Sequence, residues 1–297
     1  MSVKIAVSGP TRAKIEDIPH MHAIWRAVFR DKDEVIAHFL QPDFAIRHGF
    51  VYNDSGLPAA MLMVLDSKLH KTGERGALGY IYACATLPEH RAKGYMRRLI
   101  AYAAEQCAHR YKSFALVPAE ESLFEYYAGL GFDDFFYIDE AKFSFDALSR
   151  ISVPGSDVFW PDTRDITVMR ERFLQRRDHT VYEHGFADTA LFMCREYGGV
   201  ALAAVDGGNE GYLVAKKEND TVTATEIIAD KQTFCLLAGR LLEKLPAKEY
   251  IFRAPAGCGL FGGRAAAKRF AMLKAYAAEA AGDTGGEARP YFGLALD

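Results

Sequence analysis

Residues 85–96 read ATLPEHRAKGYM, and this segment is the most informative stretch of the chain for its fold. The apolar run over residues 79–87 predicts a buried strand, which Pro88 ends. Residues 94–109 then predict a helix, because apolar side chains recur there at helical spacing: Met96, Leu99, Ile100 and Ala103. The segment is therefore expected to be a strand that passes through a glycine-containing basic turn into a helix.

Such a turn is predicted to bind an anion. The first amides of a helix have no intrahelical partner and carry the positive end of its dipole. Gly94 lets a phosphate approach the backbone closely, and Arg91 and Lys93 add positive charge. The spacing does not match a Walker loop, since no G-x-x-x-x-G-K-[ST] is present.

The segments around this turn predict a mixed α/β or α+β domain that ends near Leu148. Helices are expected after Asp17 and near residues 35–40, and a hairpin is expected around residues 53–56. Residues 113–117 predict a strand, residues 121–128 a helix and residues 135–145 a further strand.

Two linker-like stretches, residues 152–157 and 161–162, precede a second region of similar order. A helix is predicted over residues 168–178 and another over 232–245. The predicted strands cover residues 191–196, 200–205, 212–217, 221–228 and 249–253. The strand-helix-strand order of the first region recurs, so we predict a diverged duplication, with domains at residues 1–150 and 151–297.

A second motif follows the anion-binding turn. Residues 127–132 read YAGLGF, and they close the helix predicted over residues 121–128. A tyrosine five residues before the Gly-Phe corner is placed to direct its phenol toward the same cleft as the turn.

Together, the two motifs resemble those of the GCN5-related N-acetyltransferase (GNAT) family, over roughly residues 15–145. The matching positions are Arg91-x-x-Gly94 after Pro88 and the Tyr127-to-Phe132 corner. Two positions depart from the family pattern: Met96 stands where a small residue is usual, and Glu120 where an Asn is frequent. The resemblance implies an α/β (α+β) fold of two tandem GNAT-like domains, each a mixed, mostly antiparallel sheet flanked by helices.

The resemblance also implies roles for single residues. Acetyl-CoA would be the co-substrate. Its diphosphate would be held by the amides of Arg91, Ala92, Lys93, Gly94, Tyr95 and Met96, and its pantetheine arm by the backbone of Ala85 and Thr86. Tyr127 would protonate the departing thiolate as the amine attacks the thioester. Arg97 and Arg98 either reach the adenosine 3′-phosphate or are solvated.

The general base is left unassigned. Glu89, His90 and Glu120 lie near the motifs in sequence, and Asp31, Asp33 and Glu34 are acidic side chains that would line a substrate cleft. The chain-terminal carboxylate at Asp297 is a further candidate, because tandem acetyltransferases of the enhanced-intracellular-survival type use a chain terminus in this way.

The second region is predicted to be a degenerate copy. Residues 228–233 read IADKQT at the position of the anion-binding turn, with no glycine and with Asp230 where a phosphate would lie. One CoA site per chain is therefore expected, with the second region shaping the acceptor cleft or an interface.

Three other features receive simpler interpretations. Residues 257–262 match G-x-G-x-x-G, but too little chain follows to build a dinucleotide fold, so a loop is expected. Residues 270–276 are expected to be a strand paired with residues 291–296, although their alanine-rich surroundings favour a helix. Cys84 is interpreted as a buried structural thiol.

Composition excludes several classes of protein. The 297 residues include 36 Lys and Arg and 39 Asp and Glu, a net charge of −3, which argues against a nucleic-acid binder. The N-terminus is too charged for a signal peptide, and no apolar run approaches the ~18 residues of a membrane span. The five cysteines are scattered without a Cys-x-x-Cys pair, so neither a disulfide scaffold nor a metal site is expected, and a cytoplasmic location is favoured.

These observations predict an acetyl-CoA-dependent N-acetyltransferase acting on a small-molecule or peptide amine. A catalytically silent CoA-binding or sensing module with the same fold is the alternative, followed by an enzyme with a different acyl donor or an O-linked acceptor. The oligomeric state is left open.

Overall fold

The computed structural model describes residues 8–71, 74–154, 158–181, 185–275 and 289–296. The N-terminal half contributes the strands β1 (Gly9–Arg12), β2 (Gly49–Asp54), β3 (Leu57–Lys71), β4 (Glu74–Thr86), β5 (Ser113–Leu116) and β6 (Asp133–Ser144). Its α-helices are α1 (Ile18–Phe29), α2 (Asp33–Phe39), α3 (Pro42–His48), α4 (Tyr95–Cys107), α5 (Glu121–Ala128) and α6 (Phe145–Ser149), with short 3-10 turns η1 (Ile15–Asp17) and η2 (Pro88–His90). The predicted strand-turn-helix at residues 85–96 is confirmed.

The C-terminal half has a similar order. Its strands are β7 (Val158–Phe159), β8 (His179–Val181), β9 (Val200–Asp206), β10 (Asn209–Glu218), β11 (Thr221–Ile228), β12 (Glu249–Pro255) and β13 (Ala266–Ala275). Its helices are α7 (Thr163–Leu174), α8 (Phe186–Glu196) and α9 (Lys231–Lys244), with the 3-10 turn η3 (Gly262–Arg264).

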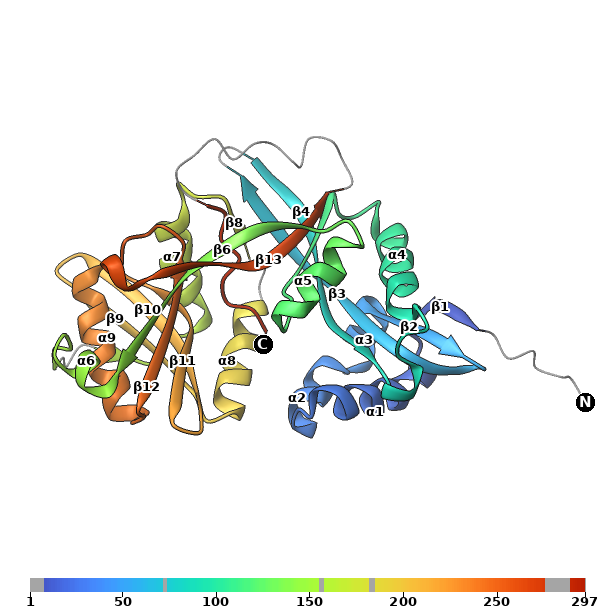
Figure 1. Ribbon diagram of the computed structural model, residues 1–297, viewed down its shortest axis with the longest axis horizontal. Helices are drawn as coiled ribbons and strands as arrows, with labels where there is room; N and C mark the ends of the chain where they lie inside the picture. Colours follow the sequence, from blue (N-terminus) through green and yellow to red (C-terminus); the bar gives the residue numbers. More distant parts are fainter. Residues whose placement is uncertain (1–7, 72–73, 155–157, 182–184, 276–288, 297) are drawn as a thin grey trace, which may run out of the picture.

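The strands form one continuous, mostly antiparallel sheet in the order β1-β2-β3-β4-β5-β13-β6-β12-β11-β10-β9-β7, with β8 paired to β3 off this path. Figure 1 shows the N-terminal half on the right, the C-terminal half on the left, and the long strands β6 and β13 crossing between them. The α/β class with a mixed, mostly antiparallel sheet flanked by helices is thus confirmed. Because β13 lies between β5 and β6, the sheet is continuous across residue 150, and a domain boundary there stays a prediction.

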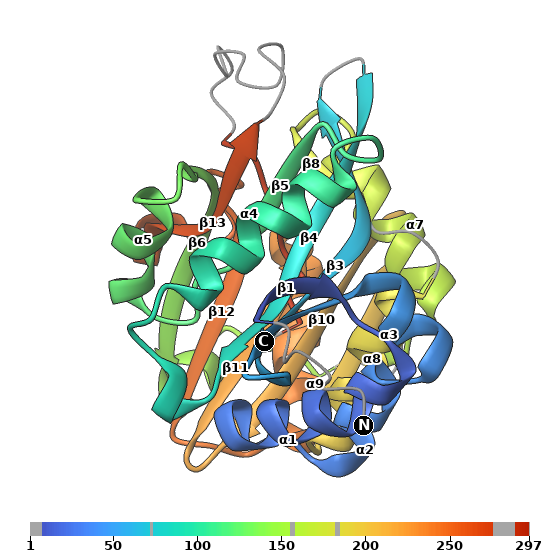
Figure 2. The same cartoon turned by 90° about the vertical axis from the view of Figure 1, so that its right-hand side faces the viewer.

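Both faces of the sheet are covered by helices. Alternate residues of β3 face opposite ways, as in any strand. Met61, Met63 and Leu65 pack with α1 and α8 in one core, and Ala60, Leu62 and Val64 pack with α4 and α5 in another. Figure 2 shows α4 lying across the near face of the sheet. In the described chain, no helix is both long and apolar enough to span a bilayer.

Two secondary-structure predictions are wrong. Residues 191–196 are the end of α8 and not a strand, since Phe186, Ala187, Ala190, Leu191 and Cys194 are buried at helical spacing. A short apolar run does not distinguish a strand from a buried helix. Residues 270–275 do form a strand, but it pairs with β5 and β6; Tyr291 makes only an isolated bridge to His179.

Candidate functional site

The site begins where β4 and β5 separate. These parallel strands pair only through Leu78–Tyr80 and Ser113–Ala115, after which β4 continues alone to Thr86 on that side. Its other edge stays paired to β3, with a bulge between Tyr82 and Ala85 where Ala83 adopts a positive φ of 51°. Among the described strands, none pairs with the far edge of β4 beyond Tyr80. The β4 edge from Ile81 to Thr86 therefore has no described strand partner on the β5 side, and we call this gap between β4 and β5 the wedge.

The turn between β4 and α4 presents backbone amides. Ala92 (φ 61°) and Gly94 (φ 72°) both adopt left-handed conformations, a pattern that makes neighbouring amides converge into an anion-binding concavity. The first backbone bond of the helix runs from the Arg98 amide to the Gly94 carbonyl, 3.2 Å away. Within the described residues, the amides of residues 92–97 have no backbone acceptor. The sequence-predicted turn therefore has the geometry of an anion site.

The basic side chains differ in their surroundings. Arg91 donates from Nε to the Thr86 carbonyl (3.3 Å), and Arg98 donates from Nη2 to the Lys93 carbonyl (2.8 Å). The Arg98 guanidinium also lies over the rings of Tyr52 and Tyr95, 5.1 and 5.4 Å from their centroids.

Met96 does not obstruct the turn. It is half-buried and packs against the core between α4 and the sheet, so its side chain leaves the amides accessible. The departure from the family pattern at this position is accommodated by packing.

Tyr127 lies on the same side of the sheet as α4. The corner after α5 holds it in place: the Phe132 amide donates to the Tyr127 carbonyl (3.2 Å), and Gly131 adopts a φ of 85°. The phenol is buried and forms a hydrogen bond with the side chain of Cys84 on β4. The structure thus brings the predicted acid to the strand expected to hold the thioester.

Burial sets the acid-base properties of this pair. It raises the pKa of Tyr127 well above 10 and the pKa of Cys84 to about 12, because a phenolate or a thiolate loses its hydration there. Both groups are therefore protonated at neutral pH. Cys84 is half-buried rather than fully buried, and its raised pKa favours the thiol over a nucleophilic thiolate.

Most of the candidate bases have other partners. Asp31 accepts hydrogen bonds from Trp25 Nε1 (2.8 Å) and Tyr197 Oη (2.5 Å), and Asp33 pairs with Arg26 (3.4 Å). His90 is bonded to Asp54 (3.0 Å), and Glu120 to Ser122 (2.9 Å). Glu34 and Glu89 are exposed, and Asp297 lies outside the described residues.

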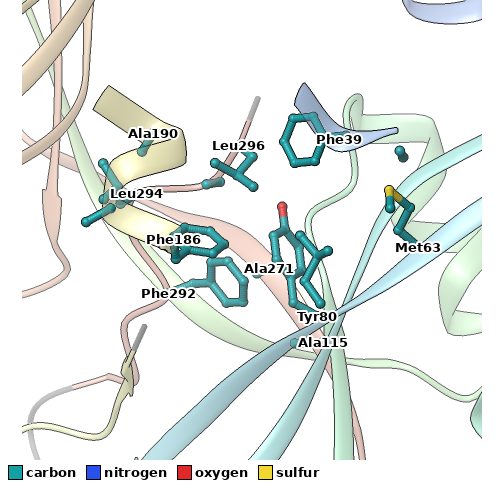
Figure 3. Close-up of a cluster of buried hydrophobic side chains, with 14 of the residues drawn as sticks. Phe39, Met63, Tyr80, Ala115, Phe186, Ala190, Ala271, Phe292, Leu294 and Leu296 are labelled. Carbon is teal, nitrogen blue, oxygen red and sulfur yellow. The ribbon is translucent and has the colours of Figure 1, made fainter. Parts of the chain in front are cut away.

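A cavity of about 690 Å³ lies on the opposite face, between α2, α3 and α8. Its apolar lining residues are Phe39, Phe44, Leu65, Phe186 and Leu296. The other lining residues, polar or charged except for Gly185, are His38, Gln41, Asp43, Arg47, His48, Asp66, Gly185, Asp188 and Thr189. Figure 3 shows the Tyr80 hydroxyl pointing between Phe39 and Leu296. Tyr80 is the last β4 residue paired with β5, and it belongs to the same apolar core as Phe39 and Leu296 of the cavity wall.

The sequence did not reveal this cavity, because its walls come from both halves of the chain. Two of its histidines are kept neutral by burial, which lowers the pKa of His38 and of His48. His48 Nδ1 lies 2.8 Å from the Val64 carbonyl, which only accepts hydrogen bonds, so Nδ1 carries the proton. Nε2 is then the unprotonated nitrogen, and it lies 4.0 Å from Asp66 Oδ2.

The C-terminal half contains a second strand-helix-strand unit, β11-α9-β12. The N-cap residue of α9 is Asp230, whose side chain accepts hydrogen bonds from the amides of Gln232 (2.8 Å) and Thr233 (2.9 Å). A carboxylate thus already occupies the amides that an anion would use. This geometry agrees with the prediction that the second unit is degenerate.

Comparisons with known proteins agree with this geometry. Residues 10–134 match the family model of the acetyltransferase (GNAT) domain. The chain is similar to three solved structures: a probable N-acyltransferase of Enterococcus faecalis V583 (14% identity, TM-score 0.68) and GCN5-related N-acetyltransferases of Kribbella flavida (15%, 0.66) and Anabaena variabilis ATCC 29413 (13%, 0.70). They cover 91%, 92% and 89% of this chain, and 72%, 72% and 71% of their own.

No curated protein matches the chain in sequence. The three structural similarities establish the fold, and the family model covers the segment that contains both motifs. The open amide turn and Tyr127 both lie inside residues 10–134, the segment that matches the model of the GNAT acetyltransferase domain.

Proposed function

We propose that this protein transfers the acetyl group of acetyl-CoA directly to an amine, with Tyr127 as the general acid. The observation that carries the proposal is the pairing of an open amide turn at α4 with a phenol directed at β4 across the same wedge. The turn would hold the diphosphate on the amides of residues 91–96, and Ala85 and Thr86 would align the pantetheine arm. A cytoplasmic location stays part of this proposal.

The acid chemistry is consistent with the burial of the site. An amine attacks the thioester carbon, the carbonyl oxygen gains negative charge, and the C–S bond then breaks to release a thiolate. Burial raises the pKa of both the Tyr127 phenol and the Cys84 thiol, so a thiolate released in the same surroundings would be a stronger base than in water. A phenol with a raised pKa can therefore still transfer its proton to that sulfur.

We place the acceptor in the cavity between α2, α3 and α8. Asp43, Asp66 and Asp188 lie on its walls, and its histidines are neutral. Asp66 pairs with Arg47 (3.5 Å) and with Arg110 (2.7 Å), so Asp43 and Asp188 leave the walls with a net negative charge. This balance favours a cationic molecule, and the neutral imidazoles can accept the proton that an ammonium group must lose before it attacks.

Thiol release from acetyl-CoA, measured with and without a panel of amines, tests the proposal. Amine-dependent release together with an acetylated product detected by mass spectrometry is the expected result. CoA binding without release would favour a silent binding module. Release that depends on alcohols, or on a different acyl-CoA, would favour the other acceptor or donor chemistries. Absence of CoA binding would remove the proposal.

A further inference from the structure

We propose that Asp54, at the end of β2, is a positioning residue that holds the amide turn before α4 in its anion-binding conformation. This inference rests on the proposed function, because the turn is taken to bind the diphosphate of CoA. Asp54 lies far from the turn in sequence, and it contacts neither Tyr127 nor the wedge in any described interaction.

One carboxylate oxygen of Asp54 contacts three groups of the turn. Oδ2 accepts a hydrogen bond from the Tyr95 hydroxyl at 2.7 Å and lies 3.0 Å from His90 Nδ1 and 3.7 Å from Lys93 Nζ. His90 precedes the left-handed residues Ala92 and Gly94, and Tyr95 follows them. Asp54 therefore fixes both ends of the segment that presents the amides.

Aromatic packing strengthens the same connection. The ring of Tyr95 stacks on that of Tyr52, two residues before Asp54 on β2, with centroids 4.2 Å apart and planes 13° apart. The Arg98 guanidinium covers both rings. The β2 end and the start of α4 thus form one packed unit.

The turn needs such support. A left-handed conformation at a non-glycine residue such as Ala92 is unfavourable and persists only where surrounding contacts over-determine it. Next to an anion site, an isolated carboxylate would repel the ligand. Asp54 instead is largely compensated by its partners: the Tyr95 hydroxyl above all, together with His90 and Lys93, holds the pKa of its carboxyl below the usual range. The role that best explains a carboxylate at position 54 is to hold the turn at residues 90–95 in place.

Calorimetric titration of CoA into the full chain tests the proposal. Asp54→Ala is expected to weaken CoA binding about 10-fold, the scale on which loss of an outer support weakens a binding group. Asp54→Asn keeps an acceptor for Tyr95 and should lose less. Glu105→Gln removes one exposed carboxylate elsewhere on α4 and should bind CoA as the unaltered chain does.

A second readout separates positioning from general loosening of the fold. S-acetylpantetheine carries the thioester without a diphosphate, so Asp54→Ala should raise the KM for acetyl-CoA while thiol release from acetylpantetheine stays unchanged. In a double-mutant cycle, Asp54→Ala combined with Tyr95→Phe should bind CoA about as well as Asp54→Ala alone, since both changes remove one connection.

Three results would overturn the inference in distinguishable ways. If Asp54→Ala binds CoA as tightly as the unaltered chain, Asp54 does not position the turn and the proposed function stands. If it impairs acetyl-CoA and acetylpantetheine equally, the effect is on the fold and not on the turn. If the unaltered chain does not bind CoA, the proposed function fails, and this inference fails with it.

Discussion

The two strand-helix-strand units of this chain, β4-α4-β5 and β11-α9-β12, have the same parallel pairing and differ in the connection before the helix. In the first unit, residues 87–94 connect Thr86 to Tyr95. In the second, only Ala229 and Asp230 connect Ile228 to Lys231. The connection of eight residues before α4 includes the left-handed residues Ala92 and Gly94, which make the amides converge. The connection of two residues before α9 is too short to form such a turn.

The helix starts differ accordingly. At α4 the N-cap is Gly94, which has no side chain to satisfy the amides, so they stay available to a ligand. At α9 the N-cap is Asp230, which bonds two of them. A cap that stabilises a helix and an anion site that binds a ligand use the same hydrogen-bond donors, so a helix start serves one purpose or the other.

The spaces beside the two helices differ as well. In the first unit the strands separate beyond Tyr80, and a phenol from α5 faces the edge. In the second unit the parallel strands also stop pairing before the helix, at Ala224 and Phe252, but there the rings of Phe234 and Phe261 pack around Phe252 at 5.1 and 6.2 Å. The second unit has an aromatic core where the first has a phenol and an open edge.

The largest expected effect comes from removing that phenol. Tyr127→Phe leaves an aromatic ring without an acid, as in the second unit, and should lower turnover about 100- to 1000-fold, the range of a general acid. CoA affinity should stay nearly unchanged, because the amide turn is intact. Steady-state thiol release and calorimetric CoA titration of the same preparation measure the two quantities.

The neighbouring tyrosine supplies the control. Tyr126 is 37% exposed and its ring meets that of Tyr127 edge-on, so Tyr126→Phe should keep full turnover. Because burial raises the pKa of Tyr127, its acid form persists at higher pH than that of a free phenol, and turnover of the unaltered chain should not fall as pH rises from 7 to about 9. Equal turnover of Tyr127→Phe and the unaltered chain would exclude the phenol as the acid.

The next effect tests whether the cap alone distinguishes the two helices. Gly94→Asp places a carboxylate at the start of α4, as Asp230 does at α9, and should weaken CoA binding about 30- to 100-fold through occupied amides and repulsion of the diphosphate. A Cβ at Gly94 meets open space, and Asp tolerates left-handed backbone better than most residues, so the fold should persist.

Gly94→Asn is the matched control, because it has the same shape and backbone tolerance without the charge. It should weaken binding less than Gly94→Asp at low salt, and the two should converge as salt screens the carboxylate. If both bind CoA as the unaltered chain does, the diphosphate is not held at this turn.

The contrast between the units also shows what the sequence could predict. Local sequence patterns were sufficient to predict the turn at residues 91–96, the helix α5 and the lack of a free anion site at Asp230. Each of these features depends on residues that are close to it in the sequence. The interpretation of residues 191–196 as a strand was wrong for the same reason: six residues hold too little periodicity to distinguish α8 from a strand.

Contacts between distant segments could not be predicted in this way. Asp54 and Tyr95 are 41 positions apart in the sequence. No local sequence pattern predicts that the end of β2 contacts the first residue of α4. The cavity takes Phe39 from α2, Phe186 from α8 and Leu296 from the end of the described chain. The insertion of β13 between β5 and β6 likewise follows from pairing across the whole sheet, which periodicity within one strand does not encode.

The smallest expected effect comes from opening the second helix start. Asp230→Ala removes the cap of α9 and should lower the free energy of unfolding by about 1 kcal/mol, measured by chemical denaturation. It should not create CoA binding, because the connection is still two residues long and the rings of Phe234, Phe252 and Phe261 still fill the neighbouring space. A second equivalent of CoA bound by Asp230→Ala would show that the cap by itself had closed this site. Unchanged binding stoichiometry with a measurable loss of stability would instead place the difference between the units in the length of the connection and the packing beside it.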